Sequence, residues 1–196
     1  MESIREILEL FDTKEKWYAF IELSQKRDAL VKELNSRLIT ELKAIAKESL
    51  TDSGWSFESS SGWFYIFPTG DSDIRVIIEP QWWNHEWCRR GVSLWGNHDY
   101  LDNYRVVKKL WENKPLLPIN EFEETIKNHG WFMFTKTIPS GVFGVESQVT
   151  SYEECIFGAK DNPRQLAKNL WEEVFQPFAK KEIADLLKSI SQNCKK

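Results

Sequence analysis

Leu94-Trp95-Gly96-Asn97-His98-Asp99, which leads to Leu110-Trp111-Glu112, returns in related form as Ile156-Phe157-Gly158-Ala159-Lys160-Asp161, which leads to Leu170-Trp171-Glu172. An apolar pair followed by Gly and then Asp is typical of a strand that turns into a helix. Gly permits the turn, and the Asp carboxylate can accept hydrogen bonds from the free amides of the first helical turn. We therefore expect each copy to form a strand, a turn and a helix, with Asp99 and Asp161 as the helix caps.

The segments upstream of the two copies also correspond. Gly54-Trp55 and Gly62-Trp63 in the first half are echoed by Gly130-Trp131 in the second, and a helical pattern precedes these steps in both halves. This order predicts an α+β fold, with one or more antiparallel β-sheets flanked by helices, built from two pseudo-repeated α-β-β-β-α units. The alternative is that short matches in a chain with 10 tryptophans arise by chance.

The expected organisation is one compact domain with three parts. Residues 1–50 form an N-terminal helical segment that packs on the core, residues 51–115 the first αβ unit, and residues 116–196 the second unit with the closing helix. Apolar residues at spacings of three and four predict a helix over 14–50, either continuous or broken at 24–28. Strands are expected at 55–57, 63–67, 74–78, 91–95, 131–137, 142–149 and 154–157. Further helices are expected at 99–113, 120–128 and 163–190, with a break at Pro177.

Composition limits the classes of protein. With 41% apolar residues the chain can bury a sizeable core, and it has no apolar run long enough to span a bilayer. The charged N-terminus does not resemble a signal peptide, and 3 cysteines give neither a disulfide framework nor a paired-cysteine metal site. A net charge of −4 argues against binding to nucleic acid that is dominated by electrostatic attraction to the phosphates. We expect a cytoplasmic protein with no membrane contact and no cofactor.

The segment 81–90, Gln-Trp-Trp-Asn-His-Glu-Trp-Cys-Arg-Arg, concentrates indole, imidazole and guanidinium groups. If one face of this hairpin meets water, such a cluster can stack on a partner's side chains, on sugars or on bases. A protein is the favoured partner, nucleic acid is the second partner class, and a purely structural hairpin tip is the alternative. The candidate binding residues are Trp82, Trp83, His85, Trp87, Arg89 and Arg90. Six other tryptophans are expected in the core: Trp55, Trp63, Trp95, Trp111, Trp131 and Trp171.

Four residue patterns suggest a catalytic or metal site, and each of them is incomplete. Asn97-His98 matches a fragment of the calcineurin-like metallophosphoesterases, but the rest of that ligand shell is missing. A metal site from His85, Glu86, Cys88 and His98, or a reactive Cys88 thiol, rests on single spacings. Asp73 and Glu79 approach a nuclease pattern in which Gln81 stands where a lysine is expected. The chain is therefore expected to lack catalytic and metal residues, the alternative being a metal-dependent enzyme that acts on nucleic acid or another phosphate ester.

The order of the elements supplies one family resemblance. The segments that carry it are Ile74-Arg75-Val76-Ile77-Ile78-Glu79, Arg90-Gly91-Val92-Ser93-Leu94-Trp95-Gly96, Gly130-Trp131-Phe132-Met133 and Leu170-Trp171-Glu172. From Lys14 onward the chain resembles the C-terminal accessory region of bacterial PD-(D/E)XK nuclease-like proteins. Since the nuclease motif is absent, the resemblance implies a non-catalytic recognition or assembly module linked to nuclease, phage or defence systems. It assigns no functional residue.

Overall fold

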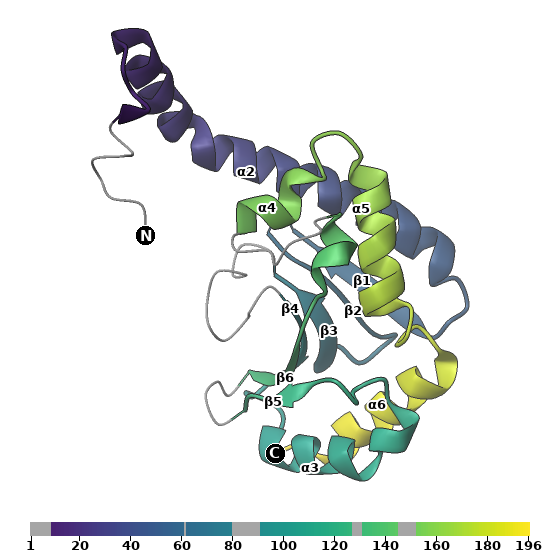
Figure 1. Cartoon of the computed structure of the whole chain (residues 1–196). Helices are drawn as coiled ribbons and strands as arrows, with labels where there is room; N and C mark the ends of the chain where they lie inside the picture. The colour runs from purple at the N-terminus through teal and green to yellow at the C-terminus, as the bar shows by residue number, and fades with distance from the viewer. Residues whose placement is uncertain (1–8, 61, 80–90, 127–130, 145–151) are drawn as a thin grey trace. The chain divides into compact units, whose positions relative to one another are not determined.

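The computed structural model of the chain describes residues 9–60, 62–79, 91–126, 131–144 and 152–196. It contains a six-stranded antiparallel sheet with the strand order β1-β2-β3-β4-β6-β5, together with several helices, so the α+β prediction is confirmed (Figure 1). The strands are β1 (Trp55–Ser59), β2 (Phe64–Pro68), β3 (Ile74–Ile78), β4 (Gly91–Gly96), β5 (Glu123–Glu124) and β6 (Phe132–Thr137).

The helical elements precede, interrupt and follow the strands along the chain. The α-helices are α2 (Lys14–Ser49), α3 (Asn103–Glu112), α4 (Tyr152–Phe157), α5 (Pro163–Leu170) and α6 (Lys181–Asn193). The described residues also form two short 3₁₀ segments, η2 (Lys114–Leu116) and η3 (Ser140–Phe143), and one π-helical segment, η4 (Trp171–Phe175). As predicted, the closing helix is interrupted near Pro177, because α6 begins only at Lys181.

The chain divides into two compact units, Met1–Glu33 and Leu34–Lys196. Helix α2 is continuous from Lys14 to Ser49, so of the two expected arrangements the single helix is the one found. In the first unit, the rings of Phe11, Trp17 and Phe20 contact one another. In the second unit, strands from residues 51–115 and from residues 116–196 share one sheet.

One face of the sheet supports the core of the second unit. Phe64, Ile66, Val76 and Leu94 alternate with side chains of the opposite face and are fully buried. The Phe64 ring meets Phe175 of η4 edge-on at a centroid distance of 5.0 Å. Helix α6 packs against β2 and β3, and α3 lies beside α6 (Figure 1). The helices therefore cover this face.

The termini of α3 and α5 differ from the expected caps. Asp102 caps α3 by accepting from the Arg105 amide, and Asn162 caps α5 by accepting from the Gln165 amide. Asp99 and Asp161 each lie before the true cap. After Gly96 the turn is longer than predicted, so α3 begins at Asn103 and not at residue 99, whereas α5 begins at Pro163 as predicted.

The second copy of the repeated phrase does not form a strand. Ile156 and Phe157 end helix α4, so a turn joins two helices there, whereas Leu94 and Trp95 belong to β4. The predicted helix at 120–128 is also wrong, since Glu123 and Glu124 pair with Thr135 and Phe134 of β6. Tertiary pairing overrides the local capping pattern at that point. Of the predicted strand at 142–149, residues 142 and 143 belong to η3, and 145–149 lie outside the described residues.

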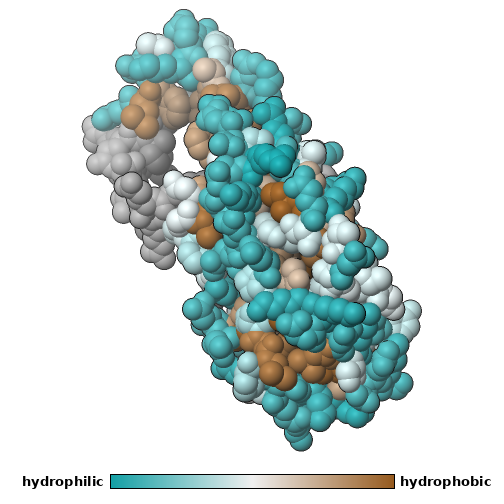
Figure 2. Space-filling view, turned by 90° about the vertical axis from the view of Figure 1, so that its right-hand side faces the viewer, coloured by the Kyte–Doolittle hydropathy of each residue, from teal (hydrophilic) through white to brown (hydrophobic). Residues whose placement is uncertain are grey.

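The surface seen in Figure 2 is mainly hydrophilic, with hydrophobic side chains gathered in separate patches (Figure 2). The large apolar side chains that are most exposed include Leu10, Leu23, Tyr104 and Leu116. Within the described ranges, no helix has both the length and the apolar character that crossing a membrane requires.

Candidate functional site

The six residues predicted to bind a partner, Trp82, Trp83, His85, Trp87, Arg89 and Arg90, lie outside the described residues. The segment that holds them connects β3 to β4. These same two strands carry a second set of aromatic and guanidinium groups, which the structure does describe. That set lies on the face of the sheet opposite Phe64 and Val76.

The strand register brings these groups together. Arg75 of β3 pairs directly with Trp95 of β4, and Tyr65 of β2 pairs with Ile77 of β3. Because side chains two positions apart on a strand share a face, Tyr65, Arg75 and Trp95 point to the same side. Three neighbouring strands thus each contribute one planar group to one row.

The Arg75 guanidinium lies between two rings. Its Cζ atom lies 4.4 Å from the Tyr65 ring centroid and 4.4 Å from the Trp95 ring centroid. Its Nε donates to the Ser72 carbonyl at 2.8 Å, which fixes the plane of the group. Cation–π attraction on both faces therefore holds the guanidinium in place.

Further rings extend the row at both ends. Trp63 stacks on Tyr65 at 4.7 Å, and Trp95 stacks on Trp131 at 5.1 Å with 16° between the ring planes. His98 meets Trp131 edge-on at a centroid distance of 3.7 Å. We call this continuous row the aromatic ladder; its members are Trp63, Tyr65, Arg75, Trp95, Trp131 and His98.

The ladder is open to solvent over part of its length. Tyr65 is 4% exposed and buried, whereas Trp63, Trp95 and Trp131 are of intermediate exposure. The His98 side chain is 42% exposed. Large aromatic side chains held rigid and half-exposed are the type of surface that binding sites use.

Charges of both signs surround the ladder. The Tyr65 hydroxyl donates to the Glu58 carboxylate, and burial together with this hydrogen bond raises the pKa of Tyr65 to about 12. Asp73 accepts a hydrogen bond from the Asn97 side chain at 3.3 Å and forms an ion pair with Lys195 at 3.8 Å. The local charge is therefore mixed.

Of the catalytic candidates, Gln81, His85, Glu86 and Cys88 lie outside the described residues, and Asp73 and Glu79 do not come together. Asp73 and Glu79 flank the five residues of β3 at its two ends, which places them about 20 Å apart at 3.3 Å per residue. Burial raises the pKa of the Glu79 carboxyl. Asn97, the phosphoesterase candidate, instead donates to Asp73. Among the described residues, no group of three or more His, Cys, Asp or Glu side chains could hold a metal ion.

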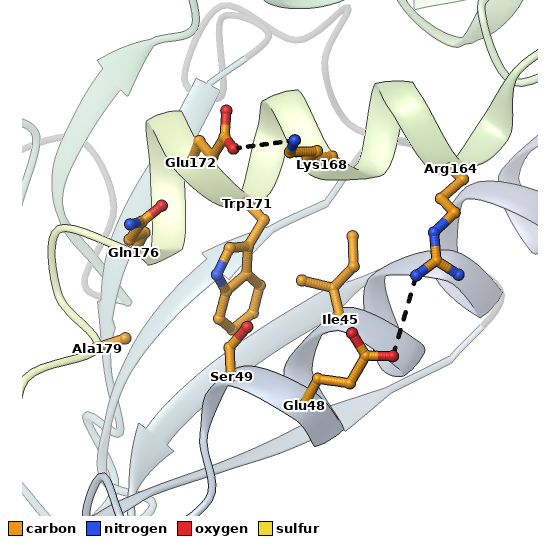
Figure 3. Close-up of a pocket in the computed structure, with 9 residues that line it drawn as sticks. All are labelled: Ile45, Glu48, Ser49, Arg164, Lys168, Trp171, Glu172, Gln176 and Ala179. Atoms are coloured by element: carbon orange, nitrogen blue, oxygen red, sulfur yellow. Dashed lines mark ion pairs between the residues drawn. The ribbon is translucent and has the colours of Figure 1, made fainter.

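A cleft lies on the helical side of the second unit, between the C-terminal part of α2 and the α5–η4 segment (Figure 3). Its volume is about 550 Å³. Both helices and the turn after η4 line it, through Ile45, Glu48, Ser49, Arg164, Lys168, Trp171, Glu172, Gln176 and Ala179. Ile45 and Trp171 supply apolar surface, and the Trp171 indole reaches from η4 toward Ser49 (Figure 3).

The π-helical segment shapes this cleft. The Gln176 amide donates to the Trp171 carbonyl at 2.8 Å, which closes an i→i+5 turn. Residues five positions apart consequently lie on one side, so that Trp171 and Gln176 both reach the cleft. Short π-helical segments are rare and occur often at functional sites.

The charged groups of the cleft are paired loosely. Arg164 lies 3.8 Å from Glu41 and 3.9 Å from Glu48, and Lys168 lies 3.8 Å from Glu172. These separations exceed hydrogen-bond distance. Within the described part of the chain, the side chains of Arg164 and Lys168 make no hydrogen bond, and the same holds for the Trp171 indole nitrogen.

The prediction that six tryptophans belong to the core is correct for some of them. Trp55 and Trp171 are each 4% exposed, Trp63, Trp95 and Trp131 are half-buried, and Trp111 is 37% exposed, which contradicts its assignment to the core. Trp111 lies at the surface of α3, where its Nε1 donates to Glu124.

The signal for the ladder is present in the sequence. Trp63 and Tyr65 alternate with buried Phe64, and Trp95 follows buried Leu94. The described residues offer stacking surfaces and hydrogen-bond donors.

Comparison of the chain with protein-family models, with curated proteins and with solved structures finds no match.

Proposed function

We propose that the chain is a non-catalytic recognition module that binds a segment of another protein through the aromatic ladder. The observation that carries the proposal is the Trp95–Trp131 stack, which is half-exposed on the face of the sheet opposite the helices. Exposed tryptophans in a fixed arrangement contribute strongly to protein interfaces.

Rigidity supports this role. The Arg75 guanidinium lies between the Tyr65 and Trp95 rings and contacts both. Its own position is fixed by the hydrogen bond that Nε donates to the Ser72 carbonyl. Side chains that are already fixed lose little conformational entropy when a partner binds. Most of the conformational entropy of the ladder side chains is therefore lost on folding, and little more is lost when a partner binds.

The charges favour a protein over a single-stranded nucleic acid. A nucleic-acid platform combines stacking rings with a basic groove that follows the phosphates. Here the rings on both sides of Arg75 occupy its two faces, and Glu58 and Asp73 place carboxylates near the row. The resemblance to accessory regions of nuclease-like proteins makes a nuclease the first partner class to test.

The test is capture of partners from lysate by the full chain and by Trp131→Ala, with Trp111→Ala as the matched control. Trp111 is exposed and lies outside the ladder. We expect the wild-type chain and Trp111→Ala to capture the same protein, and Trp131→Ala to lose it while it remains folded by circular dichroism. Capture that survives Trp131→Ala would overturn the proposal.

An oligonucleotide separates the two partner classes. Fluorescence anisotropy with a labelled fifteen-nucleotide oligo-dT should show no binding at micromolar protein. Binding that disappears in Trp131→Ala would instead identify the ladder as a nucleic-acid platform. Cleavage of DNA or RNA in Mg²⁺ or Mn²⁺, lost in Glu79→Ala or His98→Ala, would establish the enzymatic alternative.

A further inference from the structure

We infer that the cleft between α2 and the α5–η4 segment binds a small zwitterion with an apolar body, of the class of free α-amino acids with apolar side chains. The cleft lies on the helical side of the sheet and the ladder on the opposite face. The inference is therefore independent of the proposed function.

The size and the apolar surface of the cleft suit a small molecule. Its volume of about 550 Å³ lies within the range of about 300–1,000 Å³ that is typical of small-ligand sites. Ile45 and Trp171 offer apolar surface between the two helices (Figure 3). A side chain of modest size can rest against them.

The charges around this apolar surface match a ligand that carries both signs. Arg164 and Lys168 project from α5, while Glu48 projects from α2 and Glu172 from η4 (Figure 3). A ligand carboxylate can accept from the two cations, and a ligand ammonium can donate to the two carboxylates. A ligand with one charge would gain one pair of contacts and be repelled by the other pair.

The hydrogen-bonding capacity of these groups is not used up within the cleft. The Arg164–Glu48 and Lys168–Glu172 separations of 3.9 and 3.8 Å leave their donors and acceptors without a direct hydrogen bond to each other. A bound zwitterion would satisfy these groups together.

The π-helical segment supplies the second, independent observation. A regular α-helix would separate Trp171 from Gln176 around its axis, whereas the i→i+5 turn places both on the cleft. Short π-helical segments are rare and occur often at functional sites. Here it adds an amide side chain beside the indole.

The affinity is expected to be modest. The side chains of Arg164, Lys168, Glu48 and Glu172 are 65, 61, 69 and 55% exposed, so solvent screens each charge. For this type of shallow, polar site we expect a dissociation constant of about 0.1–1 mM.

The first experiment compares three ligands of one shape by calorimetric titration of the full chain: phenylalanine, phenylacetate and phenethylamine. Phenylalanine carries both charges, and each of the others carries one. We expect phenylalanine to bind at least fivefold more tightly than either analogue. Absence of phenylalanine binding at 10 mM, or equal binding of an analogue, would overturn the inference.

The second experiment exchanges the charges of the cleft. Arg164→Gln should weaken phenylalanine binding at least fivefold and leave phenethylamine unchanged or tighter. Glu172→Gln should also weaken phenylalanine binding, but make phenylacetate tighter. Lys43→Gln is the control, because Lys43 is exposed on α2 and does not line the cleft. Equal effects of Lys43→Gln, or no effect of the cleft variants at an unchanged melting temperature, would contradict the site.

Discussion

The guanidinium carbon of Arg75 lies 4.4 Å from the Trp95 ring centroid, and the same carbon lies 4.4 Å from the Tyr65 ring. One side chain of β3 thus links the two neighbouring strands on the face of the sheet that carries the aromatic ladder. This link makes Arg75 a structural group as well as a member of the proposed contact surface.

Replacing Arg75 should lower the free energy of unfolding. Arg75→Met removes two cation–π contacts and the hydrogen bond to Ser72, and we expect a loss of about 1–3 kcal/mol. Arg75→Lys keeps the charge but loses the planar group that fits between the rings, so it should recover less than half of the loss. Urea denaturation measures both variants. Full recovery by lysine would show that charge, and not stacking, stabilises the row.

Tyr65 should make stability depend on pH in the alkaline range. Folding raises the pKa of Tyr65 from 10.0 to about 12, chiefly through burial. This shift stabilises the folded state by about 2–3 kcal/mol at most. The stabilisation is fully present below pH 10 and is lost as the pH rises through 12. Unfolding of Tyr65→Phe should therefore be less sensitive to pH between 10 and 12 than unfolding of the wild type. Tyr104→Phe, at an exposed tyrosine, should leave the wild-type dependence unchanged.

The first four strands could be predicted from the sequence because local rules suffice there. Alternating side chains and turn residues such as Gly70, whose φ is +85°, mark strands that pair with their neighbours in sequence. The later elements depend on distant contacts. Ile156 and Phe157 form a short apolar run that suits a buried helix as well as a strand, and local periodicity does not separate the two.

The candidate sites were harder to predict for a related reason. Trp95 is assigned to the core by its hydrophobicity. Its alternation with Leu94 indicates that the two side chains lie on opposite faces, but the register with Arg75 is needed to show that Trp95 faces away from the helices. The cleft depends on Ile45 and Gln176, which are distant in sequence and meet only through tertiary packing. Single-sequence patterns carry no information on such a meeting.

Lys136 should contribute more to stability than a surface ion pair. Its side chain is 19% exposed, and its Nζ lies 2.8 Å from Glu121 and 2.7 Å from Glu173. Burial lowers the pKa of Lys136, but the hydrogen bonds to the two carboxylates outweigh burial, and the net direction is upward. We expect Lys136→Met to cost about 1–3 kcal/mol, because the partly buried Glu173 loses its partner.

The matched control for Lys136 is Lys109→Met. Lys109 lies 2.7 Å from Glu112, with side chains that are 49 and 45% exposed, and solvent screens such a pair, so that it adds little to stability. Chemical denaturation of both variants gives the comparison. Equal losses would show that burial adds nothing to the Lys136 contacts.

Gly96 should resist substitution although its backbone is not in the left-handed region. A Cβ atom added there would lie 2.5 Å from Asn103 Oδ1 and 3.0 Å from Met133 Sδ. Asn103 is buried and its side-chain amide donates to the Gly96 carbonyl at 3.0 Å, so it cannot move aside without losing that bond. We expect Gly96→Ala to cost about 1–3 kcal/mol. Gly141→Ala is the control, since no heavy atom lies within 4 Å of its added Cβ. If thermal unfolding shows the same small change for both variants, the contact between the β4 end and α3 is looser than these distances indicate.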